Sequence, residues 1–239
     1  MHEFITVPIK FNPDLLRQFA TSFGEALNNQ QVDVIVLTGR DNYFCMGMDL
    51  DYIATDYDPC FVAQFCNTLK MMKSSSKPVL AKVEGGVIAG GLALLSTVDF
   101  IIADETASFC LPESAFGLTP AIAIACLLER IKPHHIKYLA WTSVAISAKQ
   151  ALEWGVVDKV SSEASLDQDI LLMSHLFSRT PANVIRESRQ LLSKYSSFED
   201  VINQGGQLLQ DKLKDIQMIE KISGYLENIR LFNDEYARD

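Results

Sequence analysis

Three short apolar runs, separated from one another by helical patterns, constrain the fold of this chain most. They are VDVIVLTG at 32–39, VLAKVEG at 79–85 and FIIAD at 100–104. Runs rich in β-branched apolar residues are typical of buried strands, and we expect the first to lie in a parallel sheet. Strands that alternate with helices along the chain predict an α/β fold.

The other elements follow from local signals. Asn12 as a cap and Pro13 in the first turn predict a helix that ends near residues 28–29. GGVIAGGLALLSTVD at 85–99 predicts a glycine-rich turn that leads directly into an apolar helix. We expect an edge strand at 5–11 because of Pro8, strands at 107–113 and 156–160, and helices at 59–73, 121–131 and 147–154.

From about residue 165 onward the pattern is almost entirely helical. We therefore expect a core domain at 1–165 and a C-terminal helical region at 166–239. Amphipathic helices at the end of a chain often bury their apolar face against another subunit, so the pattern favours a homo-oligomer.

Charge and cysteine content narrow the class of protein. The formal net charge is −9, which argues against non-specific binding to nucleic acid. No apolar run is long enough to cross a membrane, and the first residues do not have the pattern of a secretory signal. The five cysteines form no CxxC pair and are odd in number, which favours a reduced, cytoplasmic protein.

Three segments are candidates for chemistry. The first, at 44–50, contains Gly47, which permits a turn whose following N–H groups point into a cleft. The second, at 87–92, contains Gly90 and Gly91 before an apolar helix but fits neither the dinucleotide fingerprint nor the phosphate-binding loop. Alone, the first is better explained by an ordinary turn with Asp49 as a helix cap, and the second is a weak signal that close helix packing also explains.

The third segment, at 109–114, places Glu113 among Phe, Leu and Pro residues. A carboxyl group in apolar surroundings is either a helix cap or a general base with a raised pKa.

Taken together, the order of these segments, with AKQALEWGVVDKV following, resembles the crotonase (enoyl-CoA hydratase/isomerase) superfamily over about residues 30–160. The resemblance implies a spiral core of ββα turns, a C-terminal helical region used for trimerisation, and acyl thioester substrates on coenzyme A or an acyl carrier protein. It also implies an oxyanion hole made by two main-chain N–H groups, which match Met48 and Gly90 here. No resident cofactor and no metal are implied.

Glu113 matches one of the family's two catalytic glutamates, whereas the other is replaced by Ala93. A hydratase that activates water with two carboxylates is therefore not expected. One carboxylate is sufficient for a double-bond isomerase, or for removing an α-proton while a β-hydroxyl departs. The implied substrate-binding residues are Gly47, Asp49, Ala89, Gly91, Ala93 and Phe116.

A closer likeness is to the dehydratases of polyketide β-branching cassettes. It rests on Ala89 before the two glycines, on Ala93, and on Phe116-Gly117-Leu118 followed by Pro120-Ala121. It implies dehydration of a 3-hydroxy-3-methylglutaryl group on an acyl carrier protein. The chain departs from that pattern at Ile88, where a polar residue is expected, and lacks most of the usual N-terminal strand hairpin. An enoyl-CoA isomerase or hydratase and a non-catalytic carrier-protein scaffold remain as alternatives.

Other polar residues give weaker signals. His134-His135 predicts a solvated turn rather than a metal site. Several basic residues either meet a phosphate of the carrier or form exposed helical faces, and we favour exposed faces. They are Lys132, His134, His135, Lys137, Arg186, Arg189 and Lys194. Candidates for a further acid or substrate contact near the first segment are Tyr43, Tyr52, Tyr57, Asp49 and Asp51, and Cys45 and Cys110 flank the site without an evident activating partner.

Overall fold

Two sheets form the centre of the molecule. The computed structural model describes the backbone of residues 1–193 and 197–236, and the side chains as far as residue 230. The larger sheet has the order β1-β2-β4-β6-β9, all parallel, with strands His2–Thr6, Val34–Thr38, Val79–Val83, Phe100–Asp104 and Lys159–Ser161. The smaller has the order β3-β5-β7-β8, with strands Tyr43–Cys45, Gly86–Ile88, Ser108–Cys110 and Ile146–Ser147, and only its last pair is antiparallel.

Successive strand pairs alternate between the two sheets. In the pairs β2/β3, β4/β5 and β6/β7, the first strand joins the larger sheet and the second joins the smaller. Each pair is followed by helical structure: α2 (Leu50–Thr55) and α3 (Cys60–Lys73), then α4 (Gly90–Leu95), then a short 3₁₀ helix, η1 (Pro112–Phe116), and α5 (Ala121–Leu127). This repeat is the spiral of ββα turns that the resemblance implied.

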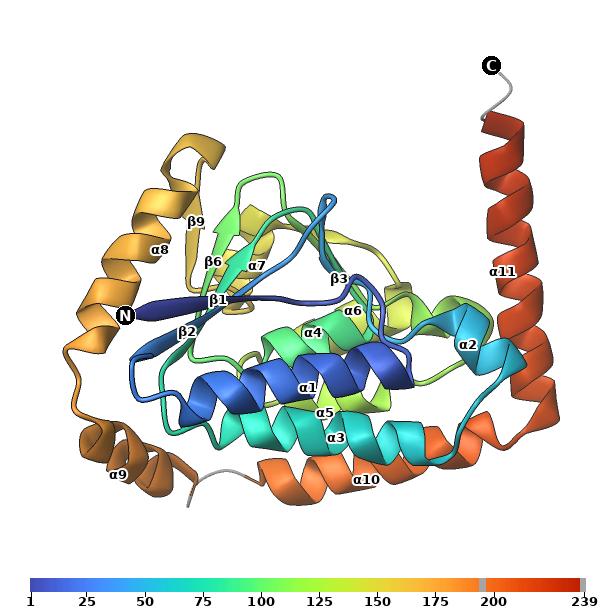
Figure 1. The fold of residues 1–239 in the computed structure, drawn as a ribbon. Coiled ribbons are helices and arrows are strands. Elements are labelled where there is room, and N and C mark those ends of the chain that lie inside the picture. Colours follow the sequence, from blue (N-terminus) through green and yellow to red (C-terminus); the bar gives the residue numbers. More distant parts are fainter. Residues whose placement is uncertain (194–196, 237–239) are drawn as a thin grey trace.

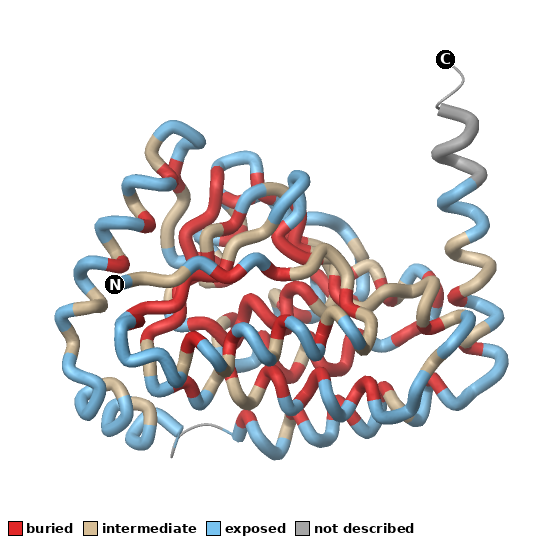
Figure 2. Tube along the Cα trace, viewed as in Figure 1, coloured by how far each residue is buried: buried red, intermediate tan, exposed pale blue. Residues whose placement is uncertain are grey.

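Helices cover both faces of the sheets (Figure 1). α1 (Pro13–Asn28) packs on α3, and α5 packs on α4. On the other face, α8 (Glu163–Ser178) places Leu166 and Ile170 against Val36 and Leu80 of the larger sheet. Figure 2 shows the buried backbone gathered between these layers.

The C-terminal helices contribute to the core and to the surface. α10 (Phe198–Leu213) packs along α3 and α5 with Ile202 fully buried, and α11 (Ile216–Tyr236) then projects away from the body (Figure 1). None of the side chains of α9 (Ala182–Ser193) is fully buried, and Ile185 and Arg189 are half-buried. The division predicted at residue 165 falls inside α8 and stays a prediction, as does trimerisation.

Most elements that the sequence predicts are present. Asn12 caps α1 by accepting from the Leu15 N–H at 2.9 Å, and Ser147 and Gly155 bound α7 (Ala148–Trp154). The prediction of a glycine-rich turn that leads directly into a helix was wrong in one respect, because residues 86–88 form the strand β5. Gly86 obscured this strand, since glycine has a low strand propensity.

The histidine pair is a second correction. His134 and His135 lie in the first turn of α6 (Pro133–Thr142) rather than in a solvated turn, and the His135 ring stacks on Trp154 at 4.4 Å. Within the described part of the chain, no helix has the length and apolar character needed to cross a membrane.

Candidate active site

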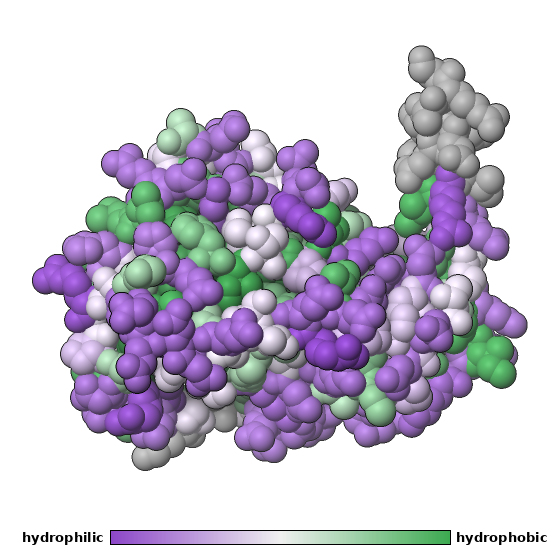
Figure 3. Space-filling view, in the orientation of Figure 1, coloured by the Kyte–Doolittle hydropathy of each residue, from purple (hydrophilic) through white to green (hydrophobic). Residues whose placement is uncertain are grey.

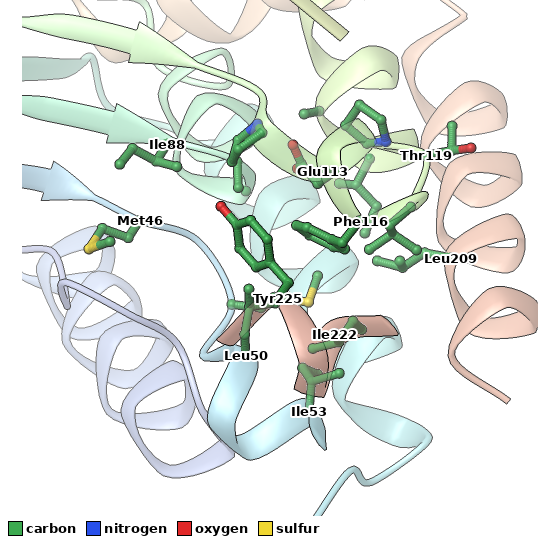
Figure 4. A pocket seen from close by; sticks show the side chains of 18 of the residues that line it. Met46, Leu50, Ile53, Ile88, Glu113, Phe116, Thr119, Leu209, Ile222 and Tyr225 are labelled. Atoms are coloured by element: carbon green, nitrogen blue, oxygen red, sulfur yellow. The ribbon is translucent and has the colours of Figure 1, made fainter. Parts of the chain in front are cut away.

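A largely apolar cavity of about 330 Å³ lies between the two glycine segments, η1 and the C-terminal helices. Its wall is built by Met46 and Met48 after β3, by Ile88, Ala89 and Gly90 at the β5–α4 junction, by Glu113 and Phe116 of η1, and by Leu209, Ile222 and Tyr225 of α10 and α11, among others. Figure 4 shows the labelled side chains, among them Met46, Ile88, Glu113, Phe116 and Tyr225, converging on one space. The structure therefore places Met48, Ala89, Gly90, Glu113 and Phe116, which the resemblance implied as site residues, on the wall of one cavity, and their roles stay predictions.

The two glycine segments are in direct contact. Gly47 has φ +79°, and a Cβ built on it would lie 2.5 Å from the nitrogen of Gly90. A side chain at Gly47 would therefore force the two segments apart, which explains why glycine is needed there.

The pairing of Phe11 with this loop sets the direction of the Met48 amide. The Phe11 N–H donates to the Gly47 oxygen at 2.7 Å, and the Asp49 N–H donates to the Phe11 oxygen at 2.9 Å. In a parallel bridge of this kind, the N–H of the residue between the two partners points to the opposite side. The Met48 N–H is thus directed away from the N-terminal segment and forms no hydrogen bond with the described residues.

The Gly90 amide is free for a different reason. It is the first residue of α4, and the first N–H groups of a helix have no partner within it. Ala89 precedes it with φ +53°, held by an N–H bond to the Cys110 oxygen at 2.9 Å. This bond links the glycine segment directly to the segment that carries Glu113.

Glu113 is a buried carboxyl group. Its residue is 8% exposed, and its Oε2 atom forms no hydrogen bond with the described residues. Burial raises the pKa of Glu113 to about 7, against a smaller lowering by its own backbone N–H. Such a group exchanges a proton readily near neutral pH, as a general base or acid must.

Four of the predicted substrate-binding residues lie behind the cavity wall rather than on it. Gly47 and Gly91 allow close backbone contacts, since a Cβ on Gly91 would meet the Cys45 oxygen at 2.2 Å. Asp49 accepts from the Asp51 N–H at 3.2 Å and thereby caps α2, and Ala93 is fully buried in the core. Within the described residues none of the four lines the cavity, and a direct contact with substrate stays a prediction.

The tyrosines considered near the first segment also lie off this wall. Tyr43 is exposed, and the Tyr52 hydroxyl accepts from the Asp58 N–H at 2.7 Å. The Tyr57 hydroxyl is buried and forms no hydrogen bond with the described residues. Asp51 pairs with Arg230 of α11.

Neither flanking cysteine has the surroundings of a nucleophile. Burial raises the pKa of Cys45 to about 12, and the pKa of Cys110 is also raised by burial. The Cys110 thiol lines the cavity and donates to the Ser143 oxygen at 3.2 Å. A thiol with a raised pKa holds little thiolate at neutral pH.

Four of the predicted basic residues are exposed, which agrees with the favoured interpretation, whereas His135 and Arg189 are half-buried. His134, Lys137 and Arg186 are exposed on helices, and Lys132 is exposed directly before α6. The half-buried His135 stacks on Trp154. Arg189 instead has a structural role, with bonds to the Lys73 oxygen at 2.7 Å and to Asp99 at 2.6 Å. Lys194 lies outside the described residues.

Sequence reasoning missed the contribution of the C-terminal helices to the cavity. Tyr225 of α11 packs on Phe116 with ring centroids 4.8 Å apart, and Leu209 and Ile222 complete that side of the wall. Lys10, which pairs with Asp49 at 3.7 Å, was missed as well. The helical pattern of the tail predicted apolar faces, but nothing in it indicated which residues meet η1.

Comparisons with known proteins agree with this geometry. The family model described as enoyl-CoA hydratase/isomerase matches residues 10–232. The bacillaene synthase dehydratase PksH of Bacillus subtilis is 34% identical over 155 residues, which are 61% of this chain and 56% of that protein. A carnitinyl-CoA dehydratase of Salmonella paratyphi B is 33% identical over 160 residues, 61% and 60% of the two chains. The chain thus spans less than two thirds of these curated relatives.

Solved structures match over a larger share. The crystal structure named as a polyketide biosynthesis enoyl-CoA hydratase (PksH) from Bacillus subtilis has a TM-score of 0.85 and 27% identity, covering 95% of this chain and 93% of that one. A methylmalonyl-CoA decarboxylase, at 21% identity and a TM-score of 0.79 over 95% and 92% of the chains, shares the fold. Because the family model matches nearly the whole chain, this protein is a member of the enoyl-CoA hydratase/isomerase family.

Proposed function

We propose that the protein is a dehydrating lyase that acts on a β-hydroxy-β-methyl acyl thioester, namely a 3-hydroxy-3-methylglutaryl group on an acyl carrier protein. The observation that carries the proposal is one buried carboxyl group, Glu113, in the same apolar cavity as Met48 and Gly90, whose amides are free of partners among the described residues. The name of the similar Bacillus subtilis dehydratase supports the polyketide context.

The proposed reaction begins at the carbon next to the thioester carbonyl. Glu113 as carboxylate removes the α-proton, and the negative charge moves to the carbonyl oxygen. The N–H groups of Met48 and Gly90 stabilise that oxyanion, and each such donor contributes about 10²–10³ in rate. The enolate then expels the β-hydroxyl group, which leaves as water once it has gained a proton, and a carbon–carbon double bond forms.

The apolar wall supports this chemistry in two ways. It desolvates the carboxylate, which makes it a stronger base, and it strengthens the hydrogen bonds to the oxyanion. The apolar core position of Ala93 is consistent with elimination that uses a single carboxyl group.

The thioester is carried by phosphopantetheine of a carrier protein or by coenzyme A, and we propose no resident cofactor or metal. We further propose that the protein forms a homotrimer or hexamer, that it works in the cytoplasm, and that it binds neither a membrane nor nucleic acid. The five cysteines are free, consistent with a reducing compartment.

Incubation with a 3-hydroxy-3-methylglutaryl carrier protein and with a 3-enoyl-CoA tests the proposal. We expect mass spectrometry to detect loss of one water from the acylated carrier, with no such loss in the Glu113→Gln variant. Migration of the double bond in the enoyl-CoA without water loss would favour an isomerase instead. Absence of turnover of either thioester would favour the scaffold.

A further inference from the structure

Elimination of a hydroxyl group requires an acid as well as a base, because hydroxide itself is a poor leaving group. In a site with two glutamates the second carboxyl group is available for this proton, but Ala93 occupies that position here. Another side chain on the cavity wall is therefore a candidate for the acid.

Among the described residues that line the cavity, few side chains carry a proton that they could give to a departing hydroxyl group. The Cys110 thiol already donates to the Ser143 oxygen. Lys10 pairs with Asp49, and Thr119 is exposed. The remaining hydroxyl group on the wall belongs to Tyr225.

The position of Tyr225 suits a proton donor. Its ring lies on Phe116, four positions from the start of η1, with an interplanar angle of 41°. Figure 4 shows its hydroxyl directed into the cavity, into the space bordered by Met46, Ile88 and Glu113. None of the described residues forms a hydrogen bond with this hydroxyl, so it is free to donate to a bound molecule.

The electrostatic surroundings keep the hydroxyl protonated. Burial raises the pKa of Tyr225 above its ordinary value, and the neighbouring Cys110 and Glu113 raise it further. At neutral pH the group is therefore a hydrogen-bond donor and a proton source rather than a phenolate.

We propose that Tyr225 is the catalytic acid that protonates the departing β-hydroxyl group. This inference rests on the proposed function of the site. Glu113 takes the α-proton, the electron pair of the broken C–H bond passes through the enolate to form the C=C bond, and the C–O bond breaks with its electrons. The Tyr225 proton joins that oxygen to give water, and the resulting phenolate recovers a proton from Glu113 or from solvent.

A change of leaving group separates this role from a packing role. Fluoride is a far weaker base than hydroxide and leaves without taking a proton, so elimination from a 3-fluoro-3-methylglutaryl thioester depends on Glu113 but much less on a proton donor. We expect Tyr225→Phe to eliminate water at least about 10²-fold more slowly than the unchanged protein. We expect the same variant to eliminate fluoride at nearly the unchanged rate, because Phe keeps the ring on Phe116.

Tyr57→Phe is the matched control, since it removes a buried tyrosine hydroxyl that lies off the cavity wall. We expect it to retain both reactions, whereas Glu113→Gln loses both. Unchanged water loss in Tyr225→Phe, or an equal fall in both of its reactions, would overturn the assignment of Tyr225. If the unchanged protein eliminates neither water nor fluoride, the proposed function fails and this assignment fails with it.

Discussion

At the scale of single residues, the site is determined by where one carboxyl group is buried. Glu113 follows β7 in a 3₁₀ turn, with apolar Phe116 in the same turn and Tyr225 packed on Phe116. Its surroundings offer Oε2 no partner among the described residues, so the neutral form is favoured until about pH 7. From the sequence, a raised pKa was one of two open interpretations of Glu113, the other being a helix cap, and the buried position favours the raised pKa.

Activity should therefore follow the ionisation of Glu113. The base acts as carboxylate, so we expect kcat/KM for water loss to rise with pH and to reach half its plateau near pH 7. A pH–rate profile of the unchanged protein measures this. A plateau that extends unchanged down to pH 5 would show that a group of ordinary carboxyl pKa, and not this one, is the base.

Stability should have the opposite dependence on the same group. Because the folded pKa lies above the unfolded value of about 4.5, the folded state binds the proton more tightly. The stabilisation that the protonated carboxyl group gives to the folded state is complete below the pKa of the unfolded state, and it is lost as the pH rises to about 7. Glu113→Gln removes the buried charge, so we expect it to be more stable than the unchanged protein at pH 8, by up to about 3 kcal/mol.

Urea denaturation at pH 8 and at pH 5 measures this difference. The advantage of the Gln variant should shrink at pH 5, where the unchanged carboxyl group is already neutral. If the stability advantage of Glu113→Gln over the unchanged protein were smaller at pH 8 than at pH 5, the result would contradict a Glu113 carboxylate that is destabilised by burial.

At the scale of elements, the close contact between the loop after β3 and the start of α4 holds the two amides in place. We expect Gly47→Ala to lower turnover by about 10²-fold or more, since a Cβ 2.5 Å from the Gly90 nitrogen displaces that amide. The positive φ at Gly47 adds a cost of about 1–3 kcal/mol to folding. Steady-state kinetics and thermal unfolding measure the two effects.

Gly24 provides the matched control for this substitution. It lies inside α1, and nothing comes within 4 Å of a Cβ built there. We expect Gly24→Ala to leave turnover unchanged and to stabilise the fold by about 0.5–1 kcal/mol. Equal losses of turnover in both variants would indicate that the Gly47–Gly90 contact has no special role.

Local signals in the sequence were sufficient where neighbouring residues alone define an element, as with the Asn12 cap of α1 and the β-branched run of β2. They failed at β5, because Gly86 has no side chain to pack and the strand exists only through its pairing with β3 and β7. The family resemblance indicated Met48, Gly90 and Glu113, which line one cavity, and their chemical roles stay predictions. Tyr225 and Lys10 were out of reach, since their place on the wall depends on contacts between segments far apart in the chain.

At the scale of the whole molecule, apolar side chains remain exposed on the C-terminal helices. Figure 3 shows hydrophobic surface over α8, where Leu171, Leu172 and Leu176 are exposed. α9 adds Val184, Leu191 and Leu192, the last with 69% of its surface accessible. Apolar clusters of this kind are typical of surfaces that meet another subunit.

We expect light scattering after size exclusion to give three or six chain masses, with a second copy of this chain covering α9. Leu192→Glu should lower that mass, because it places a charge in the apolar contact. Asn183→Glu is the control, since Asn183 lies on the opposite side of α9 from Leu192. A single chain mass at every concentration would contradict the proposed assembly.

The central claim is that the amides of Met48 and Gly90 meet at one carbonyl oxygen beside Glu113. Infrared difference spectroscopy of a ¹³C-labelled 3-hydroxy-3-methylglutaryl thioester bound to Glu113→Gln, which holds it without reaction, tests this directly. Two converging donors polarise the carbonyl bond, so we predict a stretching frequency below that of the same thioester in water. A frequency equal to or above that in water would show that the two amides do not hold the oxygen.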